Sequence, residues 1–214
     1  MPNRTEHTLI DRWLATWAHA RSIEVLELDG WPVVQVGSRT RETELVCVDP
    51  GVDTFAALLR HIDGDPRAML TVIAKDVRAY RSLNLPPGVR VDRDDEMLMS
   101  ATFRDDSIPP LAAGLTFGWD VDEHLTTYSV ESGDRLAAEG SVAVLDDWAT
   151  FDNVETTPDF QRQGLGRHVM AALTTQAMGR GATSGVLAAS ADGRGLYESL
   201  GWEPALEMLS LMGT

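Results

Sequence analysis

The sequence is poor in cysteine and lysine. Cys47 is its one cysteine, and Lys75 is the one lysine among 18 basic residues. A single thiol cannot form a disulfide or a cysteine-based metal site within one chain. The apolar run "ELVCVDP" around Cys47 is typical of a buried, inert thiol. The histidines show no ligand spacing, so we expect no metal.

Long apolar runs are also absent. The N-terminal stretch "MPNRTEHTLI" has no apolar signal core, and no uncharged run is long enough to span a bilayer. We therefore expect a cytoplasmic protein without a membrane partner.

The charge is strongly negative, at −15 for the whole chain. Residues 1–100 hold 12 basic and 16 acidic groups (net −4), and residues 101–214 hold 6 and 17 (net −11). Such a surface repels nucleic acid and anionic lipid, so we expect neither as a partner. It attracts a protonated amine, although acidity also serves simply to keep a protein soluble.

The first half of the chain predicts a small α/β module. Apolar residues at helical spacing predict a helix over 7–21. The stretch "IEVLELDGWPVVQVG" predicts a hairpin that turns at Asp29-Gly30, and Pro32 indicates an edge strand. The other expected elements are strands in "ELVCVDP", "AMLTVIA" and "EMLMSATF", a helix over Thr54–Ile62 that Asp53 can cap, and a helix over 76–83.

The second half predicts four successive strands followed by a strand–helix–strand–helix–strand order. The strands lie in "LTFGWDV", "LTTYSV", "AAEGSVAVL" and "WATFDNVETT", and "TSGVLAAS" and "WEPALEMLSLM" follow later. Residues spaced by four predict a helix over Leu165–Met178, and "DGRGLYESLG" predicts a short helix with Asp192 as its cap. This order is typical of the α/β class, with the strands at 149–156 and 184–190 parallel. We place a domain boundary between residues 104 and 105.

The stretch "QRQGLGRH" joins a predicted strand to a predicted helix. It lacks the spacing of a P-loop and the third glycine of a dinucleotide fingerprint, and on its own it is typical of a tight turn. Its place at a helix start favours anion binding, because main-chain N–H groups there lack internal partners and carry partial positive charge. Arg162 and Arg167 flank the two glycines and can add charge-assisted contacts.

These residues resemble the GNAT superfamily of acetyl-CoA-dependent N-acetyltransferases. The resemblance covers about residues 110–214 and rests on "NVETTPDFQRQGLGRHVMAAL" followed by "GLYESLGW". It implies a GNAT-like mixed sheet, acetyl-CoA as acyl donor, an amine acceptor and no metal. It also implies a cofactor site made by Val154, Glu155, Thr156, Gln161, Arg162, Gln163, Gly164, Leu165, Gly166, Arg167, Ser190 and Tyr197.

The resemblance implies that Tyr197 protonates the departing thiolate, while the residue pattern alone also fits a tyrosine at the edge of the core. The sequence does not identify the general base that deprotonates the amine. Close relatives carry a glutamate where this chain has Gly185, so the candidates are Asp152, Glu155 and His124. Strand alternation places Asp152 and Glu155 on opposite faces unless a β-bulge intervenes.

The family's usual pair of helices between its first two strands has no room here. We therefore expect residues 1–104 to supply the acceptor wall, either as an unrelated α/β module or as a degenerate GNAT-like lobe. The tryptophans are typical of core residues, with pocket lining as the alternative. A non-catalytic acyl-CoA-binding protein and an interaction scaffold remain open as functions, as does a homodimer.

Overall fold

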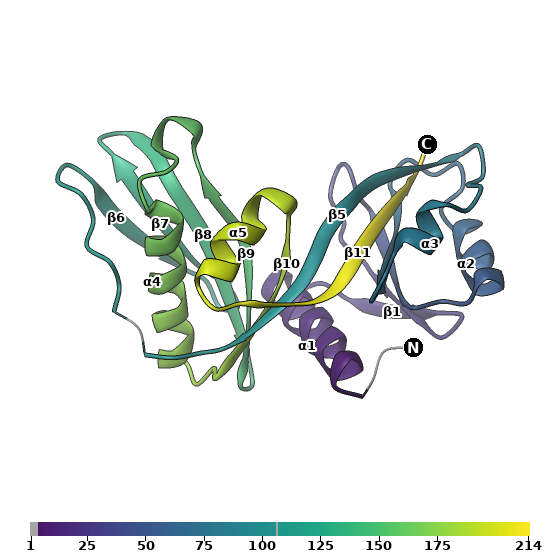
Figure 1. The fold of residues 1–214 in the computed structure, drawn as a ribbon, viewed down its shortest axis with the longest axis horizontal. Coiled ribbons are helices and arrows are strands. Elements are labelled where there is room, and N and C mark those ends of the chain that lie inside the picture. Colours follow the sequence, from purple (N-terminus) through teal and green to yellow (C-terminus); the bar gives the residue numbers. More distant parts are fainter. Residues whose placement is uncertain (1–3, 106) are drawn as a thin grey trace.

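The computed structural model describes residues 4–105 and 107–214 and, within the first helix, side chains from residue 8 onward (Figure 1). The first half contains α1 (Arg4–Arg21), β1 (Val25–Leu28), β2 (Trp31–Val34), β3 (Thr43–Val48), α2 (Val52–Leu59), β4 (Ala68–Ala74), α3 (Arg78–Arg81) and β5 (Val89–Thr102). The second half contains β6 (Thr116–Val121), β7 (Thr126–Ser132), β8 (Arg135–Leu145), β9 (Trp148–Thr156), the 3-10 turn η1 (Pro158–Phe160), α4 (Leu165–Gly179), β10 (Ser184–Ala189), α5 (Ala191–Ser199) and β11 (Glu203–Gly213).

All the described strands form one sheet. Its 11 strands lie in the order β1-β2-β3-β4-β11-β5-β10-β9-β8-β7-β6. The pairs β3–β4 and β9–β10 are parallel, and the other neighbours are antiparallel. The chain is therefore of the α/β class, as its sequence predicts.

The two halves repeat one plan and exchange their final strands. The order β3-α2-β4-α3-β5 in the N-terminal lobe matches β9-α4-β10-α5-β11 in the C-terminal lobe. However, β4 pairs with β11, β10 pairs with β5, and β5 and β11 pair with each other at the centre of the sheet. Figure 1 shows these two long strands running side by side between the lobes.

Each lobe has its own apolar core, and α1 lies over a third one. Helix α4 packs with Met99 and Leu187 in the C-terminal lobe, and α2 and α3 cover the core of the N-terminal lobe. Helix α1 buries Trp13 and Trp17 against residues of both lobes and of the central strands. Since adjacent residues of β10, Val186 and Leu187, contact α1 and α4 respectively, the two helices lie on opposite faces of the sheet.

Several local predictions were wrong in detail. Pro32 lies in the interior strand β2, where the ladder to β3 begins only at Val33, so the proline costs no hydrogen bond on that side. Helix α2 begins at Val52 with Gly51, and not Asp53, at the N-cap position, and Ser190, rather than Asp192, caps α5. Asp29 and Gly30 both have positive φ, at 53° and 82°, which confirms the hairpin turn.

Candidate functional site

The parallel strands β9 and β10 separate part of the way along their length. They pair at Ser184↔Trp148, Gly185↔Ala149 and Val186↔Thr150, and no further. Strand β10 continues to Ala189, fully paired with β5 on its other side, and β9 continues to Thr156. The main-chain groups of β9 that face β10, from Phe151 to Thr156, are thus left available to an inserted ligand.

The loop after β9 leads directly into α4. It spans residues 157–164 and includes two left-handed positions, Arg162 (φ 63°) and Gly164 (φ 83°). His168 is the first residue of α4 whose main-chain N–H bonds along the helix, to the Gly164 carbonyl. Among the described residues, the N–H groups from Arg162 to Arg167 bond no main-chain carbonyl. They form a set of donors at the positive end of a 15-residue helix.

Side chains hold the shape of this loop. Gln161 Nε2 donates to the Thr156 carbonyl at 3.2 Å, and Gln163 Nε2 donates to the Asp159 carbonyl at 3.3 Å. A Cβ atom at Gly166 would lie 2.9 Å from Leu196 Cδ2, so this glycine lets α4 and α5 approach closely. The two glycines therefore have different roles, Gly164 for backbone conformation and Gly166 for packing.

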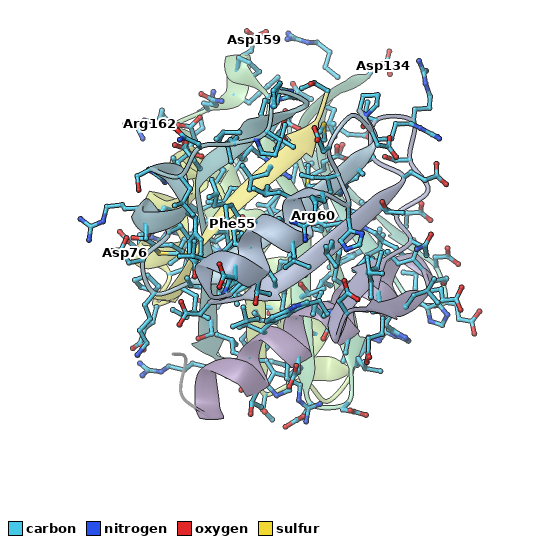
Figure 2. All side chains as sticks on the ribbon, turned by 90° about the vertical axis from the view of Figure 1, so that its right-hand side faces the viewer. Phe55, Arg60, Asp76, Asp134, Asp159 and Arg162 are labelled. Carbon is cyan, nitrogen blue, oxygen red and sulfur yellow. The ribbon has the colours of Figure 1, made fainter. Side chains whose placement is uncertain are left out.

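The two arginines of the loop differ in their engagement. Arg167 Nη2 donates to Ser199 Oγ at 3.0 Å, which ties α4 to the end of α5. Arg162 is exposed and has no hydrogen-bond or ion-pair partner among the described residues. Figure 2 shows its side chain at the edge of the molecule. Arg162 is thus the cation of this loop that is free to meet an anionic ligand.

Tyr197 lies on α5 and is 7% exposed. Burial, and in second place the Asp152 carboxylate, raise the pKa of its phenol to about 12. Its hydroxyl has no hydrogen-bond partner among the described residues, and the ring lies against Gly193 and Trp202. The side chain is therefore a neutral donor that is held in place by packing and not by a bond to the protein.

Gly185 faces the aromatic cluster of the α4 side. A Cβ atom there would lie 2.7 Å from ring atoms of Phe103 and of Trp202. No side chain fits at this position, which gives the physical reason why a glutamate is absent. A carboxylate that acts as a base on the α1 side of the sheet must therefore lie on a strand other than β10.

A β-bulge brings Asp152 and Glu155 to one face of β9. Ser141 pairs with Asp152 and Glu139 pairs with Glu155, so Asn153 and Val154 together oppose the single residue Gly140. Asn153 has a left-handed φ of 52°. The bulge turns both carboxylates to the same side, but Asp152 is half-buried while Glu155 is exposed.

On the α1 face a cleft of about 140 Å³ lies between the lobes. Trp13, Trp17 and Arg21 of α1 form one wall, and Asp152 and Ala188 lie on the C-terminal lobe. Arg21 forms an ion pair with Asp152. Residues of β3, β5 and β11 complete the lining, so the N-terminal half of the chain reaches this cleft. Asp152 connects it to Tyr197, whose pKa it raises.

Glu96 is a carboxylate of this cleft that sequence reasoning did not single out. It lies on β5, and its side chain is 14% exposed. Burial raises the pKa of Glu96, although Arg93 opposes that effect. The charged run "VDRDDE" gave no sign of a buried group. His124 lies against His19 of α1, with ring centroids 4.3 Å apart, and does not line the cleft.

Ser190 has a structural task. Its Oγ accepts a hydrogen bond from the Gly193 N–H at 3.2 Å and so caps α5. The hydroxyl hydrogen remains able to donate to a ligand at the open end of β10.

The equivalent place in the N-terminal lobe is closed. Strands β3 and β4 pair without a gap from Thr43↔Ala68 to Val48↔Ile73. Only residues 49–51 separate β3 from α2, and the Tyr80 hydroxyl lies 3.0 Å from Asp49 Oδ1 and 2.9 Å from the Pro50 carbonyl oxygen. Neither a separated strand pair nor a free loop is present, so this lobe does not repeat the ligand site.

A larger cavity of about 790 Å³ lies beside α4 at the other end of β10. Trp148 and Ser184, which form the first β9–β10 pair, lie in its lining with Arg167 and Trp202. Its lining also follows α4 from Arg167, in the first turn of the helix, to Thr175.

Among the described residues no cluster of His, Cys, Asp or Glu side chains could hold a metal ion. None of the described helices has the length and apolar character needed to cross a membrane.

Comparisons with known proteins identify the family. The model of the acetyltransferase (GNAT) family matches residues 94–202, from the middle of β5 to the residue before β11, and the chain belongs to this family. It is 37% identical over 93 residues to the [ribosomal protein bS18]-alanine N-acetyltransferase of Salmonella typhimurium, and 34% identical to that of Escherichia coli. These matches cover 42% of this chain and 63% of each relative, which is less than two thirds of their length.

Solved structures share the whole architecture. A GCN5-related N-acetyltransferase from Kribbella flavida has a TM-score of 0.66 at 16% identity, with 96% of this chain and 95% of that one covered. A tandem GNAT protein from the clavulanic acid biosynthesis pathway has a TM-score of 0.55 at 11% identity, with 96% and 94% covered. At these identities the likeness shows the fold alone. It extends the GNAT-like fold to both lobes.

Proposed function

We propose that the protein transfers the acetyl group of acetyl-CoA to a primary amine. The observation that carries this proposal is the separation of β9 from β10 directly below the donor-rich start of α4. A pantetheine arm is a narrow, extended chain with amides, and it fits between strands that expose unpaired main-chain groups. A pyrophosphate fits the free N–H groups and Arg162. The donor side is then built by residues 105–214 and the acceptor side largely by residues 1–104.

The reaction joins the amine nitrogen to the acetyl carbon and breaks the carbon–sulfur bond. The products are an amide and CoA as a free thiol, and the amine gives up one proton. An alkyl ammonium ion has a pKa of about 10.4, so a base must take its proton before attack. Asp152, Glu96 and Glu44 are the carboxylates that line the cleft, and both oxygens of Glu44 are already bonded. Asp152 lies on β9 just beyond its last pair with β10, beside the proposed place of the thioester, so we propose it as the proton acceptor.

Tyr197 acts on the other side of the bond. Its neutral hydroxyl is free to donate to the departing sulfur. Glu155 lies at the exposed end of β9. Together with Val154 and Thr156 it would bind the cofactor through main-chain groups, and its side chain would transfer no proton.

The test is the affinity for CoA of the Arg162→Glu variant. Removing one charge-assisted contact costs about 1.5–3 kcal/mol, and about 1.4 kcal/mol corresponds to a tenfold change. We expect at least tenfold weaker CoA binding by calorimetry. Arg60→Glu is the matched control, since Arg60 follows the last residue of α2 in the other lobe (Figure 2) and its side chain bonds the Ala56 carbonyl of that helix. It should bind CoA within twofold of the unchanged protein.

Equal affinity for CoA in the two variants would refute the assignment of this loop as the pyrophosphate-binding site. Absence of CoA binding by the unchanged protein would refute the proposed function. Binding without turnover on any amine would instead establish a non-catalytic acyl-CoA-binding protein.

A further inference from the structure

The interlobe cleft is lined by as many arginines as carboxylates. Arg21 pairs with Asp152, Arg41 with Glu44 and Arg93 with Glu96. The chain as a whole carries 33 acidic and 18 basic residues. A balanced cleft is therefore a local departure from the general excess of negative charge, and a bare cationic amine does not require it.

Two of these guanidinium groups converge on the wall of the N-terminal lobe. Arg41 Nη1 lies 3.8 Å, and Arg93 Nη2 lies 3.7 Å, from the sulfur of Met69. Arg41 also lies over the Trp17 ring, 5.6 Å from its centroid. Arg21 lies 6.0 Å from the same centroid, so Trp17 stands between the N-terminal wall and the Arg21–Asp152 pair.

The convergent arginines have donors to spare. Glu44 is 3% exposed and uses both oxygens, Oε2 for Arg41 Nη1 at 2.5 Å and Oε1 for the Thr71 hydroxyl at 2.6 Å. Arg93 Nη1 donates to Glu96 at 2.9 Å, and Arg93 Nε lies 3.4 Å from Asp92 Oδ2. A guanidinium offers five N–H donors, so each arginine keeps several that can bind a planar anion in pairs.

The cleft is small. Its volume of about 140 Å³ equals that of four or five waters, at about 30 Å³ for each. Sites for drug-sized ligands have about 300–1,000 Å³. The cleft therefore suits a group of amino-acid size, and a larger acceptor would extend out of it.

We infer that the acceptor is a free amino acid, whose carboxylate binds Arg41 and Arg93 while its amino group points toward Asp152 and the open strands. This inference rests on the proposed function and names its substrate class. The two ends of the cleft offer different partners to such a zwitterion: spare guanidinium N–H donors for its carboxylate at Arg41 and Arg93, and carboxylate oxygens for its ammonium group at Asp152. Trp17 between them supports the carbon skeleton.

The experiment measures acetyl transfer by thiol release with a panel of amino acids. The panel contains the L-amino acids, ω-amino acids of increasing chain length, the amide of each, and dipeptides with the same first residue. For the preferred acceptor we expect a kcat/KM at least tenfold above that of its amide, which lacks the carboxylate charge.

Arg93→Gln is the informative variant, because its side chain is 43% exposed and its removal leaves the buried Arg41–Glu44 pair intact. The ratio of kcat/KM for the acid to that for the amide should fall at least tenfold. The matched control is Arg67→Gln, where Arg67 is 54% exposed and pairs with Glu42 outside the cleft. That ratio should stay within twofold.

Three outcomes would overturn the inference. They are equal rates for acids and amides, a higher kcat/KM for dipeptides than for free amino acids, and no turnover of any carboxylated amine by a protein that binds CoA. If CoA itself does not bind, the proposed function fails first. If CoA binds and simple amines react as well as amino acids, the function stands and this inference fails alone.

Discussion

Replacing Tyr197 by phenylalanine separates two roles that its hydroxyl could have. The phenol has a pKa of about 12, whereas an ordinary thiol has a pKa of about 8.5. Complete proton transfer from this phenol to a thiolate is thus uphill by about 5 kcal/mol, at 1.36 kcal/mol for each pKa unit. A hydrogen bond to the developing charge has no such cost.

The magnitude follows from this comparison. A hydrogen bond to a charged group contributes about 1.5–3 kcal/mol, so Tyr197→Phe should lower kcat by about 10- to 150-fold. Its affinity for CoA should change less than threefold, since the hydroxyl acts on the departing sulfur. Because the folded pKa is raised, the phenol stays protonated from neutral pH up to about 11, and its contribution is lost only as the pH rises through about 12.

Tyr80→Phe is the control that the fold itself provides. Tyr80 occupies the matching helix of the N-terminal lobe, but its hydroxyl bonds Asp49 and the Pro50 carbonyl. That variant should lose about 1–3 kcal/mol of unfolding free energy and keep its kcat. Tyr197→Phe, which breaks no bond among the described residues, should show the reverse.

Steady-state kinetics, calorimetry with CoA and thermal denaturation of both variants decide the matter. An unchanged kcat in Tyr197→Phe would remove the hydroxyl from the reaction. A loss well above 150-fold would mean that the phenol transfers its proton completely, against the reasoning from the two pKa values.

Two further substitutions test the local structure. Gly185→Glu should destabilise the fold by at least about 1–3 kcal/mol, because its Cβ would meet the Phe103 and Trp202 rings; a variant with unchanged thermal stability and higher turnover would show instead that the strand can supply a base. Ser190→Ala should cost about 0.5–2 kcal/mol through loss of the α5 cap, measured by denaturant unfolding. An unchanged midpoint would mean that α5 does not depend on that hydroxyl.

The local part of the fold could be predicted from the sequence. Helix α4 and the strand before it have clear periodicity, and a glycine at 164 suits the left-handed backbone found there. The parallel pairing of β9 and β10 is confirmed as well. These features depend on residues close together in the chain, and local propensity and patterning report them.

The non-local part could not be predicted. The first half of β5 reads "VRVDRDDE", which has low strand propensity, yet it forms a strand because β11 pairs with it from Arg93↔Ser210 to Val89↔Gly213. No sequence pattern in β5 or β11 indicates that the two lobes exchange these strands. The cleft also draws on α1, β3, β5 and β11, and these residues share no motif.

The exchange of β5 and β11 also limits how this chain can be divided. A cut in the connection between β5 and β6 would leave each fragment carrying the strand that completes the other fragment's half of the sheet. We expect neither fragment to fold without the other. The two lobes therefore cannot be shuffled into other proteins as modules, and any gene rearrangement must carry them together.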